Sequence, residues 1–302
     1  MKILPRLAGL VGVGVFIYLI SKIGLRSVID NLLNANLKVI FLSVLLIFPI
    51  SFLQILRWFI ISDDKNIAHI YLYVIFYFKS LFYGFITPGK AGTFIRIKYL
   101  KDSFDYSTKK ATHSVVLDRF SDVISIAILF LFGNLLSGKT FVEKISVLAL
   151  LSLFLVVFFN NYHVLNKIFP KKLNIYITSS FKGNKEKALR LVFSFALGLF
   201  SWLLIYIQAW LVSIGLEAKV NLTSFLYVAP FSTLVGLIPI TIGGFGTRDG
   251  VYVAMMKSFG VSSALALSMS LAGYAVNALI PAIIGLILVI VGMFNKNKLL
   301  ST

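Results

Sequence analysis

Two glycine- and proline-rich stretches with charged side chains interrupt a sequence that is otherwise strongly apolar. The first is TPGKAGTFIR, residues 87–96, and the second is IPITIGGFGTRDG, residues 238–250. Glycine and proline interrupt helices, and a charged side chain at membrane depth is costly and usually functional. A broken helix with charges at membrane depth, occurring twice, is typical of the substrate site of a transporter.

The charged groups in these stretches suit the binding of a phosphate. Each broken helix exposes backbone N–H groups and the positive end of a helix dipole, and a nearby Lys or Arg adds positive charge. The substrate-binding residues that we predict here are Lys90, Arg96, Arg248 and Asp249. A structural alternative stays open, in which Lys90 and Arg96 lie at the membrane surface and Arg248 pairs with Asp249 or with a helix end.

The glycines and prolines have a backbone role in the same two stretches. Proline ends a helix, and glycine permits a positive φ and the close approach of two backbones. The residues to which we assign this role are Pro88, Gly89, Gly92, Pro239, Gly243, Gly244 and Gly246.

A third group of charges follows the first stretch, within a segment that we expect to be one long helix. Asp118 and Asp122 stand at positions i and i+4 and therefore share a helix face, and Arg119 lies beside Asp118. Two interpretations are equally supported: these residues line a polar path for the substrate, or they form an ion cluster that holds the structure together. Arg57, next to Trp58, is expected to anchor a helix at the membrane surface.

Composition indicates a polytopic membrane protein. Of the 302 residues, 59% are hydrophobic, against about 45–50% in a soluble domain. The net charge of +18 lies in loops between apolar segments, so it indicates topology and contact with anionic lipid and not nucleic-acid binding. There is no cysteine, which excludes disulfides and thiolate catalysis. We find no catalytic, metal-binding or cofactor motif and predict no such site.

The apolar segments predict the order of the helices. They fall at 4–21, 37–61, 69–86, 112–136, 145–159, 189–214, 222–242 and 262–294. A helix needs about 20 residues to cross the hydrocarbon, and several of these segments have that length. Segments 69–86 and 222–242 each run into a glycine-rich stretch and then into a piece too short to span. We therefore predict two re-entrant hairpins, each entering and leaving the membrane on one side.

The same order of elements occurs twice along the chain. At an offset near 154, Gly92-Thr93 aligns with Gly246-Thr247, and each match leads into a long helix. We predict an all-α polytopic membrane protein with a single membrane domain, residues 1–302, built from repeats 1–140 and 141–302. Each repeat has two spans, a Gly/Pro-broken re-entrant hairpin and a long helix. Because each repeat crosses the membrane three times, the second is inverted with respect to the first.

The basic loops predict the orientation in the membrane. With a cytoplasmic N-terminus, loops 87–111 and 160–190 and the C-terminal tail all lie on the cytoplasmic side, as the positive-inside rule requires. We therefore predict an integral protein of the cell membrane with both termini in the cytoplasm. Membrane topology alone explains the positive charge of loop 160–190. The alternative is that this loop docks on anionic lipid or on a partner enzyme.

At these residues the chain resembles the transmembrane region of the lysylphosphatidylglycerol synthase family, a family of flippase-like membrane proteins. The resemblance is carried by TPGKAGTFIRIKYL, VVLDRFSDV and LIPITIGGFGTRDGVYV and covers nearly the whole chain. Arg248 and Asp249 match the family's arginine–acid pair. Asp118, Arg119 and Asp122 match its acid-Arg-x-x-Asp run. Asp249 and Asp118 stand where glutamate is more usual, which keeps the charge and shortens the reach.

The resemblance implies traffic of lipids or of lipid-linked glycans. Family members that carry a soluble synthase domain flip aminoacylated phosphatidylglycerol. This chain ends at Thr302, soon after its last apolar segment, so we expect neither that domain nor synthesis of a lysyl-lipid.

The function that we expect is that of a flippase, which moves a phospholipid or a polyprenyl-phosphate-linked headgroup across the membrane. Its partners are then anionic or polyprenyl-linked membrane lipids, and nucleic acid is not among them. The alternatives are an integral-membrane enzyme, with Asp118 or Asp122 as base, and an accessory subunit of cell-surface glycan or lipid biosynthesis. A homo-oligomer and a biosynthetic partner enzyme both stay open.

Overall fold

The computed structural model describes residues 14, 16–137, 185–238 and 241–299, and every regular element in these residues is a helix. The helices are α2 (Leu25–Leu33), α3 (Leu37–Leu45), α4 (Ile47–Ile61), α5 (Ile70–Phe85), α6 (Ile95–Phe104), α7 (Thr108–Leu136), α10 (Lys185–Gly215), α11 (Leu222–Leu237), α12 (Thr247–Lys257), α13 (Ser263–Tyr274) and α14 (Ile280–Leu299). Short 3-10 turns form η1 (Ile67–His69) and η2 (Ala91–Phe94), and a π-helix forms η3 (Ala275–Leu279). The predicted all-helical class is confirmed for this part of the chain. Pro239 and segment 145–159 lie outside the described residues.

Four helical stretches among the described residues are long and apolar enough to cross a membrane. They are Leu37–Ile61, Ile67–Phe85, Leu189–Gly215 and Ser263–Phe294. They coincide with four of the predicted apolar segments. Large apolar side chains such as Phe48 and Phe52 are exposed on them, as expected where a helix faces lipid and not water. These features define an integral membrane protein.

Two polar contacts define opposite ends of the helix bundle. At the first, which we call the Asp63 end, the Asp63 carboxylate after α4 accepts from the Arg190 guanidinium near the start of α10, at 2.9 Å. At the second, the Asn36 end, the N–H of Asn36 before α3 donates to the carbonyl of Gly215, the last residue of α10, at 2.7 Å. The α3–α4 pair and α10 are therefore antiparallel, and α10 carries the chain from the Asp63 end to the Asn36 end.

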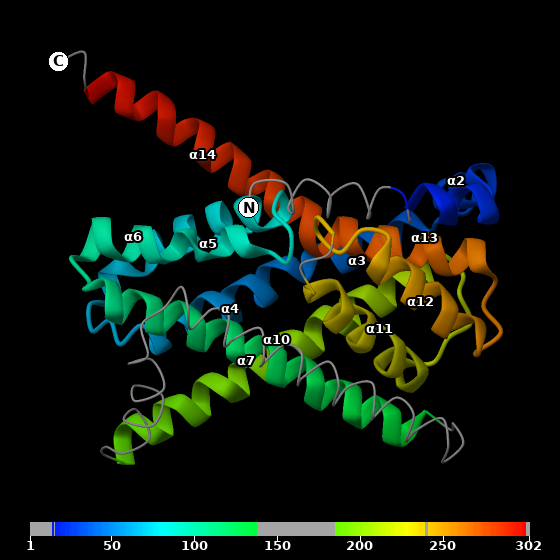
Figure 1. The fold of residues 1–302 in the computed structure, drawn as a ribbon, viewed down its shortest axis with the longest axis horizontal. Coiled ribbons are helices and arrows are strands. Elements are labelled where there is room, and N and C mark those ends of the chain that lie inside the picture. The colour runs from blue at the N-terminus through cyan, green and yellow to red at the C-terminus, as the bar shows by residue number, and fades with distance from the viewer. Residues whose placement is uncertain (1–13, 15, 138–184, 239–240, 300–302) are drawn as a thin grey trace.

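Helices of the first half of the chain pack against helices of the second half in two pairs. α7 of the first half packs along α11 of the second, and α14 of the second half packs along α5 of the first. In Figure 1, α7 (green) crosses α10 (yellow-green), while α5 (cyan) and α14 (red) lie above that crossing. A glycine permits each contact: a Cβ on Gly133 would overlap the Leu226 backbone, and one on Gly285 would overlap the Phe78 carbonyl. Small residues are the usual means by which membrane helices approach closely.

The two glycine-rich loops contact each other directly. Pro88, after α5, and Ile242, after α11, form an antiparallel backbone bridge. α5 begins close to the Asp63 end of the bundle, and α11 begins shortly after Gly215, at the Asn36 end. The two loops therefore approach each other from opposite ends of the bundle and meet between them.

The two loops also share a backbone conformation. Gly89 and Lys90 have φ of 56° and 57°, and Gly243 and Gly244, at matching positions of the second loop, have φ of 61° and 79°. Glycine adopts these angles readily, whereas a side chain makes them unfavourable. Lys90 is thus held in a conformation that a glycine adopts at the matching position.

Adding a methyl group at either interhelical glycine should destabilise the protein. Gly133→Ala and Gly285→Ala force two helix backbones apart, and overpacking of this kind costs about 1–3 kcal/mol. Thermal unfolding of the purified protein in detergent measures the effect. Gly250→Ala is the matched control, because its Cβ would lie 3.8 Å from the flexible Leu19 side chain. If all three variants unfold at the same temperature as the wild type, the close helix contacts do not contribute to stability.

Candidate functional site

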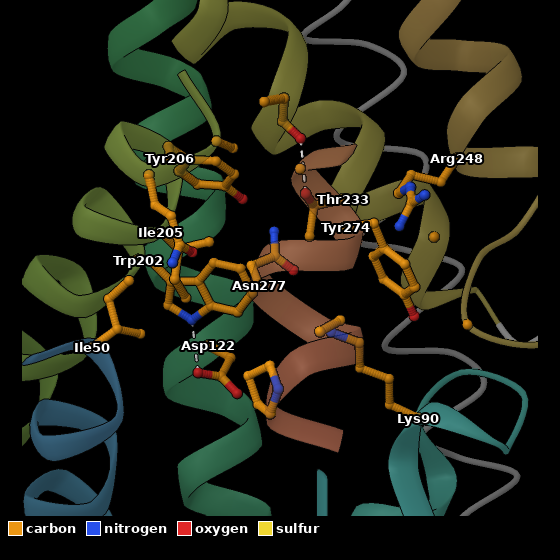
Figure 2. Close-up of a pocket in the computed structure, with 18 of the residues that line it drawn as sticks. Ile50, Lys90, Asp122, Trp202, Ile205, Tyr206, Thr233, Arg248, Tyr274 and Asn277 are labelled. Carbon is orange, nitrogen blue, oxygen red and sulfur yellow. Dashed lines mark hydrogen bonds between the residues drawn. The ribbon is translucent and has the colours of Figure 1, made fainter. Parts of the chain in front are cut away.

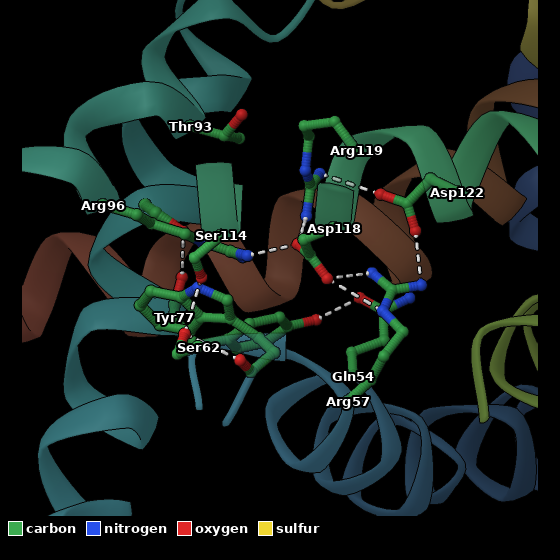
Figure 3. A network of polar contacts seen from close by, with 12 residues as sticks. Gln54, Arg57, Ser62, Tyr77, Thr93, Arg96, Ser114, Asp118, Arg119 and Asp122 are labelled. Atoms are coloured by element: carbon green, nitrogen blue, oxygen red, sulfur yellow. Dashed lines mark hydrogen bonds and ion pairs between the residues drawn. The ribbon is translucent and has the colours of Figure 1, made fainter. Parts of the chain in front are cut away.

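A network of buried charges joins three helices of the first half (Figure 3). At its centre is Asp118 of α7, which is fully buried. Its Oδ1 accepts from Arg57 Nε of α4 at 2.8 Å and forms an ion pair with Arg57 Nη2 at 2.6 Å. Its Oδ2 accepts from Arg96 Nη1 of α6 at 2.8 Å and from Arg119 Nη2 at 2.5 Å. A single carboxylate therefore holds α4, α6 and α7 together.

Asp122, one turn further along α7, extends this network to α10. Its Oδ1 accepts from the indole N–H of Trp202 at 2.7 Å and forms an ion pair with Arg57 Nη1 at 2.8 Å. Its Oδ2 pairs with Arg119 Nη1 at 3.0 Å. Three arginines thus surround two aspartates, which leaves one positive charge in excess.

The expectation that Arg57 anchors a helix at the membrane surface is wrong. The Arg57 side chain is fully buried between α4 and α7, where both aspartates of the network face it. An arginine next to a tryptophan looks the same in the sequence whether it lies at a membrane surface or between packed helices. Asp118 and Asp122, the carboxylates that place Arg57 between helices, lie about sixty residues further along the chain.

Arg96 is also held entirely by protein groups. Its Nε donates to Ser80 Oγ of α5 at 2.7 Å, and its guanidinium lies over the rings of Trp58 and Tyr77, with centroids 4.6 and 5.1 Å away. Together with the ion pair to Asp118, these contacts tie the start of α6 to α5 and α7. Arg96 thereby fixes the segment after the first loop and stands behind the wall of the cavity described below.

A smaller charged cluster fixes the segment after the second loop. Asp249 of α12 is fully buried. Its Oδ1 accepts from Arg248 Nη2 at 2.5 Å and from Ser270 Oγ at 2.6 Å, and its Oδ2 accepts from the N–H of Gly246 at 3.0 Å. The Arg248 guanidinium lies 3.9 Å from the centroid of the Tyr274 ring. Asp249 thus both caps α12 and fixes Arg248.

A cavity of about 150 Å³ lies between the two clusters and is lined by both halves of the chain. Figure 2 shows Lys90 and Arg248 on one side of it, Asp122 and Trp202 on the other, and Asn277 between Trp202 and Tyr274. Its charged lining residues are Lys90, Arg119, Asp122 and Arg248. Because the one carboxylate among them is already paired with two arginines, the cavity is positive.

Lys90 is part of this positive surrounding. It lines the cavity together with Arg119 and Arg248, so three cations border the same space. An anion placed in the cavity would offset the repulsion between them. The site is therefore arranged to favour a negatively charged group.

The structure divides the predicted substrate-binding residues into two sets. Those that line the cavity are Lys90, Arg119, Asp122 and Arg248, and those that hold its walls are Arg96, Asp118 and Asp249. Of the predicted loop residues, Gly243 lines the cavity, and a Cβ on Gly92 would overlap the Tyr83 carbonyl. Four further lining residues were not predicted from the sequence: Trp202, Gln208, Tyr274 and Asn277. For Gln208 and Asn277, the feature in the sequence that could have indicated a role is a polar amide side chain within an apolar helix.

The helices and the cavity define a polytopic membrane protein with a positively charged internal site. The chain belongs to the lysylphosphatidylglycerol synthase transmembrane-region family, whose model matches residues 6–285. It is 22% identical to a UPF0104 membrane protein of Pyrococcus horikoshii, over 97% of this chain and 98% of that protein. It is 25% identical to a UPF0104 membrane protein of Methanocaldococcus jannaschii, over 93% of both chains. The resemblance carried by the sequence motifs is thereby confirmed.

Neutralising Asp118 should destabilise the protein strongly. Asp118→Asn leaves Arg57 and Arg96 buried without their shared counter-ion, and breaking a buried ion pair costs about 3–5 kcal/mol. Thermal unfolding in detergent and the yield of monodisperse protein report the loss. Asp63→Asn is the control: it removes the charge from an ion pair whose side chains are 50% and 45% exposed, and asparagine tolerates the φ of 51° at this position, so about 0–1 kcal/mol is expected. Equal losses in the two variants would contradict the central role of Asp118.

Proposed function

We propose that this protein is a lipid transporter that moves a phosphate-bearing headgroup, of a phospholipid or a polyprenyl phosphate, across the cell membrane. The observation that carries the proposal is the positive cavity lined by both halves of the chain. A charged headgroup crosses hydrocarbon only at great cost. Fixed cations along its route replace water and lower that cost, while the acyl or prenyl chains stay in the bilayer.

The contact between the loops supports the interpretation of both as re-entrant hairpins. α5 and α11 start near opposite ends of the bundle, yet Pro88 and Ile242 form a backbone bridge. If each helix crossed to the far surface, the loops would lie on opposite faces of the membrane and would not pair. Because they do pair, we infer that each hairpin turns back inside the membrane.

The same contact supports an inverted repeat of segments 1–140 and 141–302. Pro88 and Ile242 are separated by 154 residues, the offset that also aligns Gly92 with Gly246. The bridge therefore joins matching positions, as a twofold axis between the repeats requires. The reciprocal packing of α7 on α11 and of α14 on α5 has the same symmetry. Lys110 and Arg190 both contact Asp63, so cations gather at the Asp63 end, and we place that end and both termini in the cytoplasm.

The size of the cavity fits a carrier of headgroups. A volume of about 150 Å³ has room for a small polar group. The charged residues give less support to an enzyme. Both oxygens of Asp122 are engaged by Arg57, Arg119 and Trp202, so neither oxygen is free to take a proton from a substrate. Asp118 lies outside the lining of the cavity.

Removing a cavity cation should slow translocation of an anionic lipid. We expect Arg248→Ala to lower the rate about 10- to 100-fold, since a hydrogen bond to a charged group contributes roughly 1.5–3 kcal/mol. Lys90→Asn should also lower it, because asparagine tolerates the positive φ and removes only the charge. The assay is dithionite quenching of fluorescent phosphatidylglycerol and of a fluorescent polyprenyl phosphate in proteoliposomes.

The control for this experiment is Lys257→Ala, which removes an exposed cation from the same helix as Arg248. It should translocate lipid at the wild-type rate. A wild-type rate equal to that of protein-free vesicles for both lipids would overturn the proposed function. Wild-type rates in both cavity variants would show that neither cation contacts the cargo.

A further inference from the structure

The cavity has a second polar region that carries no charge, and Gln208 of α10 is its best-defined part. Gln208 is only 1% exposed, and its Nε2 donates to the Ser43 carbonyl of α3 at 2.9 Å. This contact determines which way the amide faces. Its Oε1 has no hydrogen-bond partner in the described part of the chain, and the side chain lines the cavity. A buried acceptor without a donor is unfavourable, so Gln208 is suited to accept a hydrogen bond from a ligand.

The π-helix η3 supplies the other half of this region. It interrupts the helical run between α13 and α14 and includes Asn277. Turns of π-helix are rare and are frequent at functional sites. Here Tyr274, immediately before the turn, and Asn277 within it both line the cavity, and the Asn277 amide lies between Trp202 and Tyr274 (Figure 2). η3 packs against α10, the helix that carries Gln208.

The charged part of the cavity, where Arg248 lies against Tyr274, offers donors. Lys90 and Arg248 are cations, and the hydroxyls of Tyr252 and Tyr274 are buried without partners in the described residues. A phosphate has only acceptors to offer at neutral pH, so it fits this donor-rich region and not the free oxygen of Gln208. The group beside Gln208 has to be a donor.

We propose that Gln208 and Asn277 bind hydroxyl groups of the headgroup, so that the cavity selects a polyol or sugar phosphate over a headgroup that ends in an ammonium. The inference rests on the proposed function in one respect: the phosphate lies beside Lys90 and Arg248. An ammonium also donates hydrogen bonds, but the three cations in the lining repel it, and the one carboxylate there is already paired with two arginines. A hydroxyl donates without that repulsion and accepts from the Asn277 amide in return.

Binding of water-soluble headgroup fragments tests this selectivity without translocation. The probes are glycerol 1-phosphate, propyl phosphate and phosphoethanolamine, which share the phosphate monoester and differ in the group attached to it. They are titrated calorimetrically into the full-length protein in phosphatidylcholine nanodiscs. We expect glycerol 1-phosphate to bind about 5- to 10-fold more tightly than propyl phosphate, as one or two neutral hydrogen bonds imply. Phosphoethanolamine should bind more weakly than glycerol 1-phosphate.

Variants of the two amides locate the effect. Asn277→Leu and Gln208→Leu should each reduce the preference for glycerol 1-phosphate over propyl phosphate and leave the affinity for propyl phosphate unchanged. That retained affinity also shows that the variant is folded. Asn134→Leu is the matched control, because Asn134 is a buried amide on α7 outside the lining, and it should keep the wild-type preference.

Several results would overturn the inference. They are equal binding of glycerol 1-phosphate and propyl phosphate, equal binding of phosphoethanolamine and glycerol 1-phosphate, no binding of any probe, and an unchanged preference in both amide variants. Lipid translocation without this preference would remove the inference and leave the proposed function. The preference without translocation would remove the proposed function and leave a headgroup-binding site.

Discussion

The ionised carboxylate of Asp118 is the group on which the arrangement of the first half depends. A bare charge in a helix interface carries a large desolvation cost, and three arginines on α4, α6 and α7 offset it. None of these helices can move away without exposing a buried charge to an apolar surrounding. The network therefore holds the segment after the first loop against α7, and with it the position of Lys90 at the cavity. Asp249 holds the segment after the second loop in the same way, through fewer contacts.

Charge balance around these two carboxylates makes the cavity positive. Asp118 and Asp122 are outnumbered by Arg57, Arg96 and Arg119, and Asp249 does no more than balance Arg248. Lys90 has no carboxylate assigned to it among the described residues and adds one more positive charge at the cavity wall. An anion in the cavity would complete the balance, which links the structural networks to a phosphate-bearing substrate.

The two loops share a backbone conformation and differ in chemistry. The position that carries Lys90 in the first loop carries Gly244 in the second, and the arginine beside each loop has a different role. Arg96 is enclosed between Trp58 and Asp118, whereas Arg248 lies over Tyr274 at the cavity. Two similar frames thus present unequal side chains, and the uncharged region formed by α10 and η3 is contributed by the second half alone. Two loops with the same backbone conformation and unequal side chains suit the proposed site, which would bind different parts of one headgroup.

The sequence by itself determined the helical membrane class, four helices long and apolar enough to cross a membrane, the family and the two loops, because these follow from composition, segment length and local backbone chemistry. It also identified the charged residues that gather around the cavity. Only the tertiary structure decided which of them face it, because that depends on pairs far apart in the chain, such as Arg57 with Asp118 and Pro88 with Ile242. For the same reason, an amide such as Gln208 has no distinguishing feature in an apolar helix until its partner carbonyl on α3 shows which way it faces.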